Sequence, residues 1–401
     1  MTKKQFLRFV GFSLVLVMML VLMCDLFEIE NTKNYDKNMY TYRNLEEDSV
    51  DAVFLGTSGV DRYWIAPKAY EDYGMTVYNL SFDAFPAWLY TSCLDYALSK
   101  QDPELILIDM RAFYQDNLDY EAMDVRARRY LDSLPFFSAA RFKAAFKTMD
   151  YMHKADKSQP AFDASYIFSF IRYHSKWADD YSLYNNLGSN EQKYGSFFMS
   201  TGRSVRATPH ERVTFDTSAY NKLDQYCTDA FYELVDYIRE KDLNVLFVDT
   251  PQFLDPEELG KANALIKLLE EEELDYIHFY EPDSDEFSID FDIMTEFYDE
   301  SHVNYYGAEK FTDVFAKYID EKYDLPDRRI KSEENLNAQN FWEGKYDKVK
   351  ETIVKYENKK AKREAKKAQK EKEQALEKAL EEERIAALEA IEKNRAKKKT
   401  K

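Results

Sequence analysis

Glycine and proline are scarce in this sequence, with ten residues of each among 401. Both fall below their average usage in proteins, which excludes a collagen-like or low-complexity body. The length suits one large domain or two modest ones. With 45% hydrophobic and 16% aromatic residues, the chain can build a substantial core.

Cysteine is rarer still, with three residues and no Cys-x-x-Cys pair, which argues against a thiolate zinc site. Cys24 lies in the apolar N-terminus, and Cys93 and Cys227 read as small core hydrophobes, although one disulfide between those two stays open. The acidic stretch at 283–292 lacks the central glycine of a calcium loop. We therefore expect no metal and no cofactor.

Basic residues are outnumbered, with 55 lysines and arginines against 74 aspartates and glutamates and a net charge of -19. Phosphate binding needs clustered cations, so nucleic acid is not expected as a partner.

The N-terminus has the pattern of a membrane anchor. Three basic residues precede an uncharged run at 9–24, and we expect residues 6–27 to lie in a lipid bilayer. The basic flank predicts a cytoplasmic N-terminus and an extracellular body. A cleaved signal peptide is the alternative, but no A-x-A cleavage site follows Cys24.

Short apolar strands alternate with amphipathic helices along the body of the chain, which predicts an α/β three-layer sandwich with a central, mainly parallel sheet. The strands are expected at 52–55, 76–80, 105–108, 245–248 and 276–280. The helices are expected at 86–100, 218–241, 256–272 and 305–323. In such sheets ligands bind beyond the carboxyl ends of the strands.

The expected domain organisation has five parts. They are a cytoplasmic tip and transmembrane helix at 1–30, a stalk at 31–50, the α/β domain at 51–325 with a helical insertion at about 111–215, a linker at 326–344 and a charged helical tail at 345–401. The tail lacks glycine and proline and offers many i,i+4 opposite-charge pairs, so it should be helical over roughly 80 Å. A single solvated helix is favoured over a coiled coil, because no clean heptad is kept.

Two short motifs carry the chemistry. Ser58 follows the first strand in Gly56-Thr57-Ser58-Gly59, and Asp299-Glu300-Ser301-His302 precedes the last core helix. If the fold brings them together, Ser58 can act as nucleophile, His302 as its base and Asp299 as the group that orients the imidazole.

These two motifs resemble the first and last sequence blocks of the SGNH (GDSL-type) hydrolases, over about residues 50–325. Thr57 stands where that family more often has aspartate, and the run from Asp299 to Gly307 matches the last block well. The resemblance implies a five-stranded sheet in flavodoxin-like order and a Ser-His-Asp mechanism without a cofactor.

The two middle blocks of the family supply an oxyanion hole, and here they depart from the pattern. The second block has no glycine after the strand, so a backbone N–H of Ser81, Asp83 or Ala84 would have to donate, beside that of Ser58. The third block lacks its asparagine, and Arg111 is the candidate replacement. Losing one such donor can cost about 10²–10³ in rate.

With its anchor, the chain is similar to the divergent envelope branch of the family, which includes the D-alanyl transfer and alginate O-acetylation proteins. That resemblance implies a cell-envelope polysaccharide or teichoic-acid-like polymer as partner, beside a membrane-bound O-acyltransferase. It also suggests His174, in the segment 173–177, as a substrate-binding residue.

Two functions remain. The first is an anchored extracellular serine esterase or O-acyltransferase acting on acyl esters, with acetyl expected, of envelope carbohydrate. The second is a catalytically weak or inactive SGNH-like module that binds envelope polymer or scaffolds an acyltransferase complex. The missing middle-block residues and the charged tail favour the second.

Overall fold

A computed structural model describes residues 1–26, 38–39, 41–115, 120–173, 205–209, 218–279 and 289–399. It divides into two compact units, Met1–Val349 and Lys350–Lys401. Each is described by itself.

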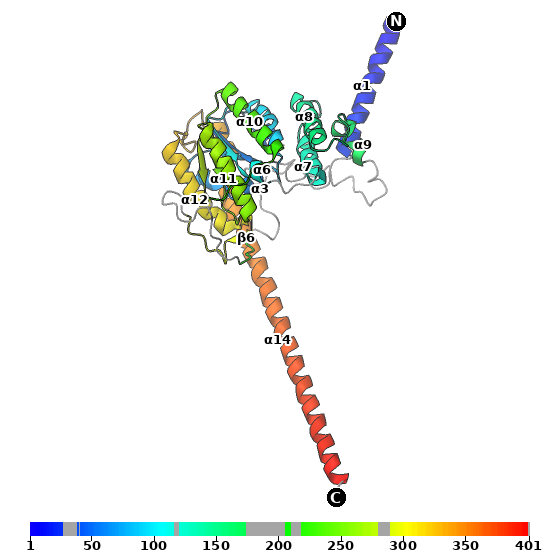
Figure 1. The fold of residues 1–401 in the computed structure, drawn as a ribbon, viewed down its shortest axis with the longest axis vertical. Helices are drawn as coiled ribbons and strands as arrows, with labels where there is room; N and C mark the ends of the chain where they lie inside the picture. The colour runs from blue at the N-terminus through cyan, green and yellow to red at the C-terminus, as the bar shows by residue number, and fades with distance from the viewer. Residues whose placement is uncertain are drawn as a thin grey trace. The chain divides into compact units, whose positions relative to one another are not determined.

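Five parallel strands form the central sheet of the first unit (Figure 1). They are β1 (Ala52–Gly56), β2 (Val77–Ser81), β3 (Leu105–Asp109), β4 (Val245–Asp249) and β5 (Tyr276–His278). Their order is β2-β1-β3-β4-β5, so the chain reverses its direction of winding between β1 and β3. The prediction of an α/β fold with a five-stranded parallel sheet is confirmed.

Every residue of β1 to β4 is buried, as in a parallel sheet that helices cover on both faces. On one side α4 (Ala66–Tyr73) packs against α12 (Tyr305–Lys322), and elsewhere α5 (Tyr90–Leu98) packs against α10 (Gln225–Lys241). Asp255 precedes the helix α11 (Pro256–Glu271) and caps its N-terminus with its side chain. The prediction started α10 at 218, but Asp224 is extended and delays the helix to Gln225.

Most of the described part of the insertion up to Tyr173 is helical. It contains α6 (Arg111–Tyr114), α7 (Tyr120–Ser133), α8 (Ala139–Ala155), the 3₁₀ turn η2 (Ala164–Tyr166) and α9 (Ser169–Tyr173). Buried ion pairs stabilise it, since Arg128 donates to Asp124 at 2.8 Å and Arg141 to Asp132 at 2.9 Å. His174, the predicted substrate-binding residue, lies outside the described residues.

The structure corrects two domain boundaries. The predicted linker at 326–344 contains α13 (Leu336–Trp342), and Trp342 is fully buried against Tyr70. The indole of Trp342 donates to the carbonyl of Ser49 at 2.9 Å, at the end of the predicted stalk. The segment that contains α13 and the described end of the predicted stalk therefore belong to the α/β domain, because the buried Trp342 joins them.

The N-terminal helix α1 (Lys3–Leu26) is long and apolar enough over Lys3–Cys24 to cross a membrane. All three cysteines are buried and free, so Cys93 and Cys227 form no disulfide. The second unit consists of most of α14 (Lys345–Lys399).

Candidate active site

A tight turn after β1 presents Ser58. The strand ends at Gly56, and Thr57 caps the short helix α3 (Ser58–Asp61) by accepting the N–H of Gly59. A Cβ at Gly56 would lie 2.2 Å from the Cβ of Asp109, so only glycine lets β1 approach the end of β3 this closely. Ser58 thus stands at the carboxyl edge of the sheet, where ligands bind in such folds.

Asp109, at the end of β3, anchors this turn and was not singled out from the sequence. Its carboxylate accepts both the backbone N–H of Thr57, at 2.8 Å, and the Thr57 hydroxyl. The hydroxyl of Thr57, which also lines the cavity described below, is therefore held by a buried carboxylate. In the sequence, the feature that could have identified Asp109 is an acidic residue at the end of an apolar strand, because a buried carboxylate needs hydrogen-bond donors.

Asp299 and His302 come from a small antiparallel hairpin, β6 (Phe297–Asp299) and β7 (His302–Val303), just before α12. The Nδ1 of His302 lies 2.7 Å from Oδ1 of Asp299. The Nε2 of His302 lies 2.7 Å from the Oγ of Ser58, although 244 residues separate the two. The structure thus brings together all three residues that the sequence proposed as a triad, at hydrogen-bonding distances.

The protonation states suit a resting serine-histidine pair. Burial lowers the pKa of His302 below its usual value; the hydrogen bond with Asp299 opposes this, while the charge of Arg111 adds to it. Burial acts to raise the pKa of Asp299, but the hydrogen bond and charge of His302, the backbone N–H of Ser301 and the charge of Arg62 together outweigh it and leave that pKa lowered. Near neutral pH a neutral His302 can donate its Nδ1–H to ionised Asp299 and accept the Ser58 hydroxyl at Nε2.

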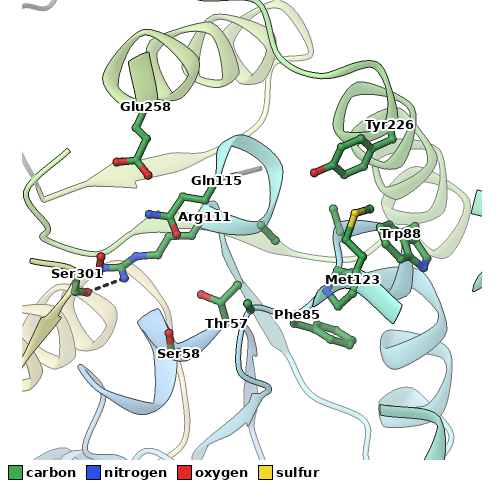
Figure 2. A pocket seen from close by; sticks show the side chains of 14 residues that line it. Thr57, Ser58, Phe85, Trp88, Arg111, Gln115, Met123, Tyr226, Glu258 and Ser301 are labelled. Atoms are coloured by element: carbon green, nitrogen blue, oxygen red, sulfur yellow. Dashed lines mark hydrogen bonds between the residues drawn. The ribbon is translucent and has the colours of Figure 1, made fainter. Parts of the chain in front are cut away.

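A cavity of about 180 Å³ opens beside Ser58 (Figure 2). It is lined by Thr57, Ser58, Ala84, Phe85, Pro86, Ala87, Trp88, Arg111, Ala112, Gln115, Met123, Tyr226, Glu258 and Ser301. Apolar side chains such as Trp88 and Met123 gather at one end, and Ser58 lies toward the other. The nucleophile candidate therefore faces a site with both polar and apolar walls.

Of the five oxyanion candidates, Ser58, Ala84 and Arg111 line the cavity, whereas Ser81, the last residue of β2, does not. Asp83 is not among the lining residues, and its carboxylate instead pairs with Arg126 at 2.7 Å. Ala84 has a φ of 45°, the left-handed conformation that favours glycine. Ala84 therefore adopts a backbone conformation that is more common for glycine.

Arg111 makes contacts that the sequence did not suggest. Its buried guanidinium donates from Nη1 to the carbonyl of Ser301 at 2.7 Å, drawn as a dashed line in Figure 2. From Nη2 it donates to the carbonyls of Thr250 and Pro251, both at 3.2 Å. Arg111 therefore ties the residue before His302 to the end of β4.

Two neighbours complete this arrangement. The Tyr63 hydroxyl also donates to the carbonyls of Pro251 and Ser301. The Nε of Arg111 has no hydrogen-bond partner among the described residues, and a Cβ at Gly59 would lie 2.8 Å from it. The absence of a side chain at Gly59 makes room for the guanidinium beside Ser58.

A second buried carboxyl, that of Asp249, lies at the end of β4. Asp249 accepts the Tyr114 hydroxyl at 2.8 Å. Burial raises its pKa to about 7, against the opposing charge of Arg111. The charge of Asp249 therefore changes near neutral pH.

No protein-family model matches this chain, and neither does any curated protein sequence. The functional assignment therefore depends on the motifs and on the geometry above.

Proposed function

We propose that this protein is a membrane-anchored serine esterase or O-acyltransferase of the SGNH type, acting on acyl esters of cell-envelope carbohydrate. The observation that carries the proposal is the hydrogen-bonded series Ser58, His302 and Asp299 at the edge of a cavity. Such an arrangement recurs on unrelated folds that perform acyl transfer.

The chemistry follows from the three positions. Ser58 Oγ attacks the ester carbonyl while His302 Nε2 takes its proton, and the same proton passes to the leaving alcohol as the acyl-serine forms. Water or an acceptor hydroxyl then gives its proton to His302 and attacks the acyl-serine, and His302 returns that proton to the Oγ of Ser58 as the acyl group leaves it. Asp299 holds the imidazole in the required tautomer and stabilises its protonated form.

The negative charge on the carbonyl oxygen needs donors at the cavity. The backbone N–H groups of Ser58 and Ala84 and the Nε–H of Arg111 are the candidates, because these residues line it. The cavity, of about 180 Å³, has room for an acyl group, and acetyl is the expected group because of the resemblance to the envelope branch of the SGNH family.

The proposed extracellular location depends on α1. If Lys3–Cys24 crosses the membrane with its basic end in the cytoplasm, the α/β domain lies outside the cell. A polysaccharide or teichoic-acid-like polymer is then the accessible substrate, and a membrane-bound O-acyltransferase is the expected partner.

A serine-directed fluorophosphonate tests the proposal. We expect the detergent-solubilised full chain to be labelled and Ser58→Ala to lose all labelling while keeping its thermal unfolding transition. Ser301→Ala is the matched control from the same cavity, because Ser301 bonds to Arg111 and to Asp299 through its backbone carbonyl and N–H. It should retain labelling.

The alternative is an inactive SGNH-like module that binds envelope polymer. One observation favours it: at the third-block position, Nη1 and Nη2 of Arg111 are bonded to backbone carbonyls instead of being offered to a substrate. Absence of labelling in correctly folded wild-type protein would support this module and refute the enzyme.

A further inference from the structure

Phenylalanine side chains gather where the insertion meets the N-terminal helix. We define the phenylalanine cluster as Phe136, Phe137, Phe142, Phe168 and Phe170. Ring centroids lie 5.0 Å apart between the first two, 6.4 Å between Phe136 and Phe142, 6.2 Å between Phe136 and Phe168, and 6.2 Å between Phe168 and Phe170. The five rings therefore form one connected surface.

This surface is not buried in the domain. Phe137 is 66% exposed, and the neighbouring Ile171 is 41% exposed. The other four rings are half-buried. A water-facing array of this kind marks an interaction site, because isolated exposed apolar residues are common but connected ones are not.

The cluster adjoins the end of the candidate membrane span. The helix α1 packs against α9, and the Ser169 hydroxyl donates to the carbonyl of Cys24 at 3.1 Å. Cys24 is the last residue of the apolar span and is buried. Because Ser169 lies between Phe168 and Phe170, the cluster must lie at the level where the span ends.

Cations accompany the rings. The guanidinium of Arg141 lies 5.5 Å from the centroid of Phe136, beneath the surface. Arg172, next to Ile171, has a side chain that is 56% exposed and approaches Asp124 at 3.6 Å. Arg141 is buried in its pair with Asp132, so Arg172 is the cation that can reach a lipid phosphate. Exposed phenylalanine beside an exposed arginine suits the headgroup zone of a bilayer.

We propose that the phenylalanine cluster is a membrane-docking surface that inserts into the headgroup region of the bilayer crossed by α1. This inference rests on the anchored orientation given in the proposed function. The lipid is favoured over a protein partner because the cluster is continuous with the span through Ser169. The insertion then has a second attachment to the membrane besides α1, which limits how far it can tilt away from the surface.

The test uses the full chain in vesicles of phosphatidylcholine and phosphatidylglycerol, with Phe137→Cys carrying an environment-sensitive nitrobenzoxadiazole probe. The native cysteines are all buried, and wild-type protein treated alike measures their background labelling. We expect blue-shifted emission that is quenched by lipids with a shallow nitroxide. The control is Ile330→Cys, which is 63% exposed and outside the insertion, and it should emit as in water.

Two results would overturn the inference. Water-like emission at Phe137→Cys means that nothing covers the cluster. Blue-shifted emission without nitroxide quenching means that protein covers it, either another part of this chain or a second copy. Carbonate extraction and fluorophosphonate labelling of the same variant report separately on the anchor and on the enzyme, so their failure is distinguishable from a failure of docking.

Discussion

Replacing Arg111 tests whether the guanidinium positions the candidate base. In Arg111→Met the carbonyls of Ser301, Thr250 and Pro251 all lose a charged donor. Ser301 and Pro251 keep the Tyr63 hydroxyl, so Thr250 bears the main loss. A hydrogen bond to a charged group contributes about 1.5–3 kcal/mol, so we expect the free energy of unfolding to fall by about 2–4 kcal/mol, well short of three such bonds.

The loss of activation free energy should be similar in size to the loss of stability. Without the Arg111 bond, the Ser301 carbonyl is held less firmly and His302 can shift; a displacement of about 1 Å can lower the rate about 10²-fold, which is about 2.7 kcal/mol. The charge of Arg111 also lowers the pKa of His302. A neutral His302 is the active base, so the rate rises with pH through that pKa. Removing the cation raises the pKa and moves the acid limb of kcat/KM to higher pH.

Arg111→Lys separates the two roles. Lysine keeps the charge but offers a compact ammonium that cannot span three carbonyls. We expect its acid limb to stay near that of wild type while kcat falls. The assay is hydrolysis of p-nitrophenyl acetate across about pH 5 to 9 by the full chain in detergent, beside urea unfolding. Wild-type kcat and an unchanged acid limb in Arg111→Met would refute the positioning role.

Two further predictions concern carboxyl groups. Asp299→Asn should lower kcat by up to about 10⁴-fold, because a carboxamide can favour the wrong tautomer of His302, and an unchanged circular dichroism melt would show that the fold is intact. Equal kcat in this variant and wild type would contradict the triad. The pKa of Asp249 is raised to about 7, so the folded state holds its proton where the unfolded chain has lost it. Stability should therefore fall as pH rises from about 4 to 7, and Asp249→Asn should remove that part of the slope in urea unfolding; an unaltered slope would contradict the raised pKa.

The strands were predictable because each is a short apolar run. Ala52–Gly56 and Leu105–Asp109 read as buried parallel strands, and both faces of the sheet are indeed covered. Helix boundaries were less accurate where one residue decides them, as at Asp224. The linker prediction was wrong because the polar residues around α13 conceal Trp342, whose burial depends on partners far away in sequence.

At the candidate site, the residue types of Ser58, Asp299 and His302 were visible in their motifs, since nucleophile, base and orienting carboxylate each need a particular side chain. That these three side chains lie within hydrogen-bonding distance of one another was a hypothesis, and only the tertiary structure could test it. The anchoring of Thr57 by Asp109 was not visible, because it joins two strand ends that pair only in the sheet.

The sequence by itself determined the parallel sheet, the apolar N-terminal helix and the identity of the reactive side chains, because periodicity and chemistry are local properties. The tertiary structure alone decided which polar groups at the strand ends meet. Arg111 shows the difference: its position after β3 suggested an oxyanion donor, but the fold brings the carbonyls of Ser301, Thr250 and Pro251 within its reach. A buried guanidinium bonds to the acceptors that packing supplies, and those acceptors lie about 140 to 190 residues away along the chain.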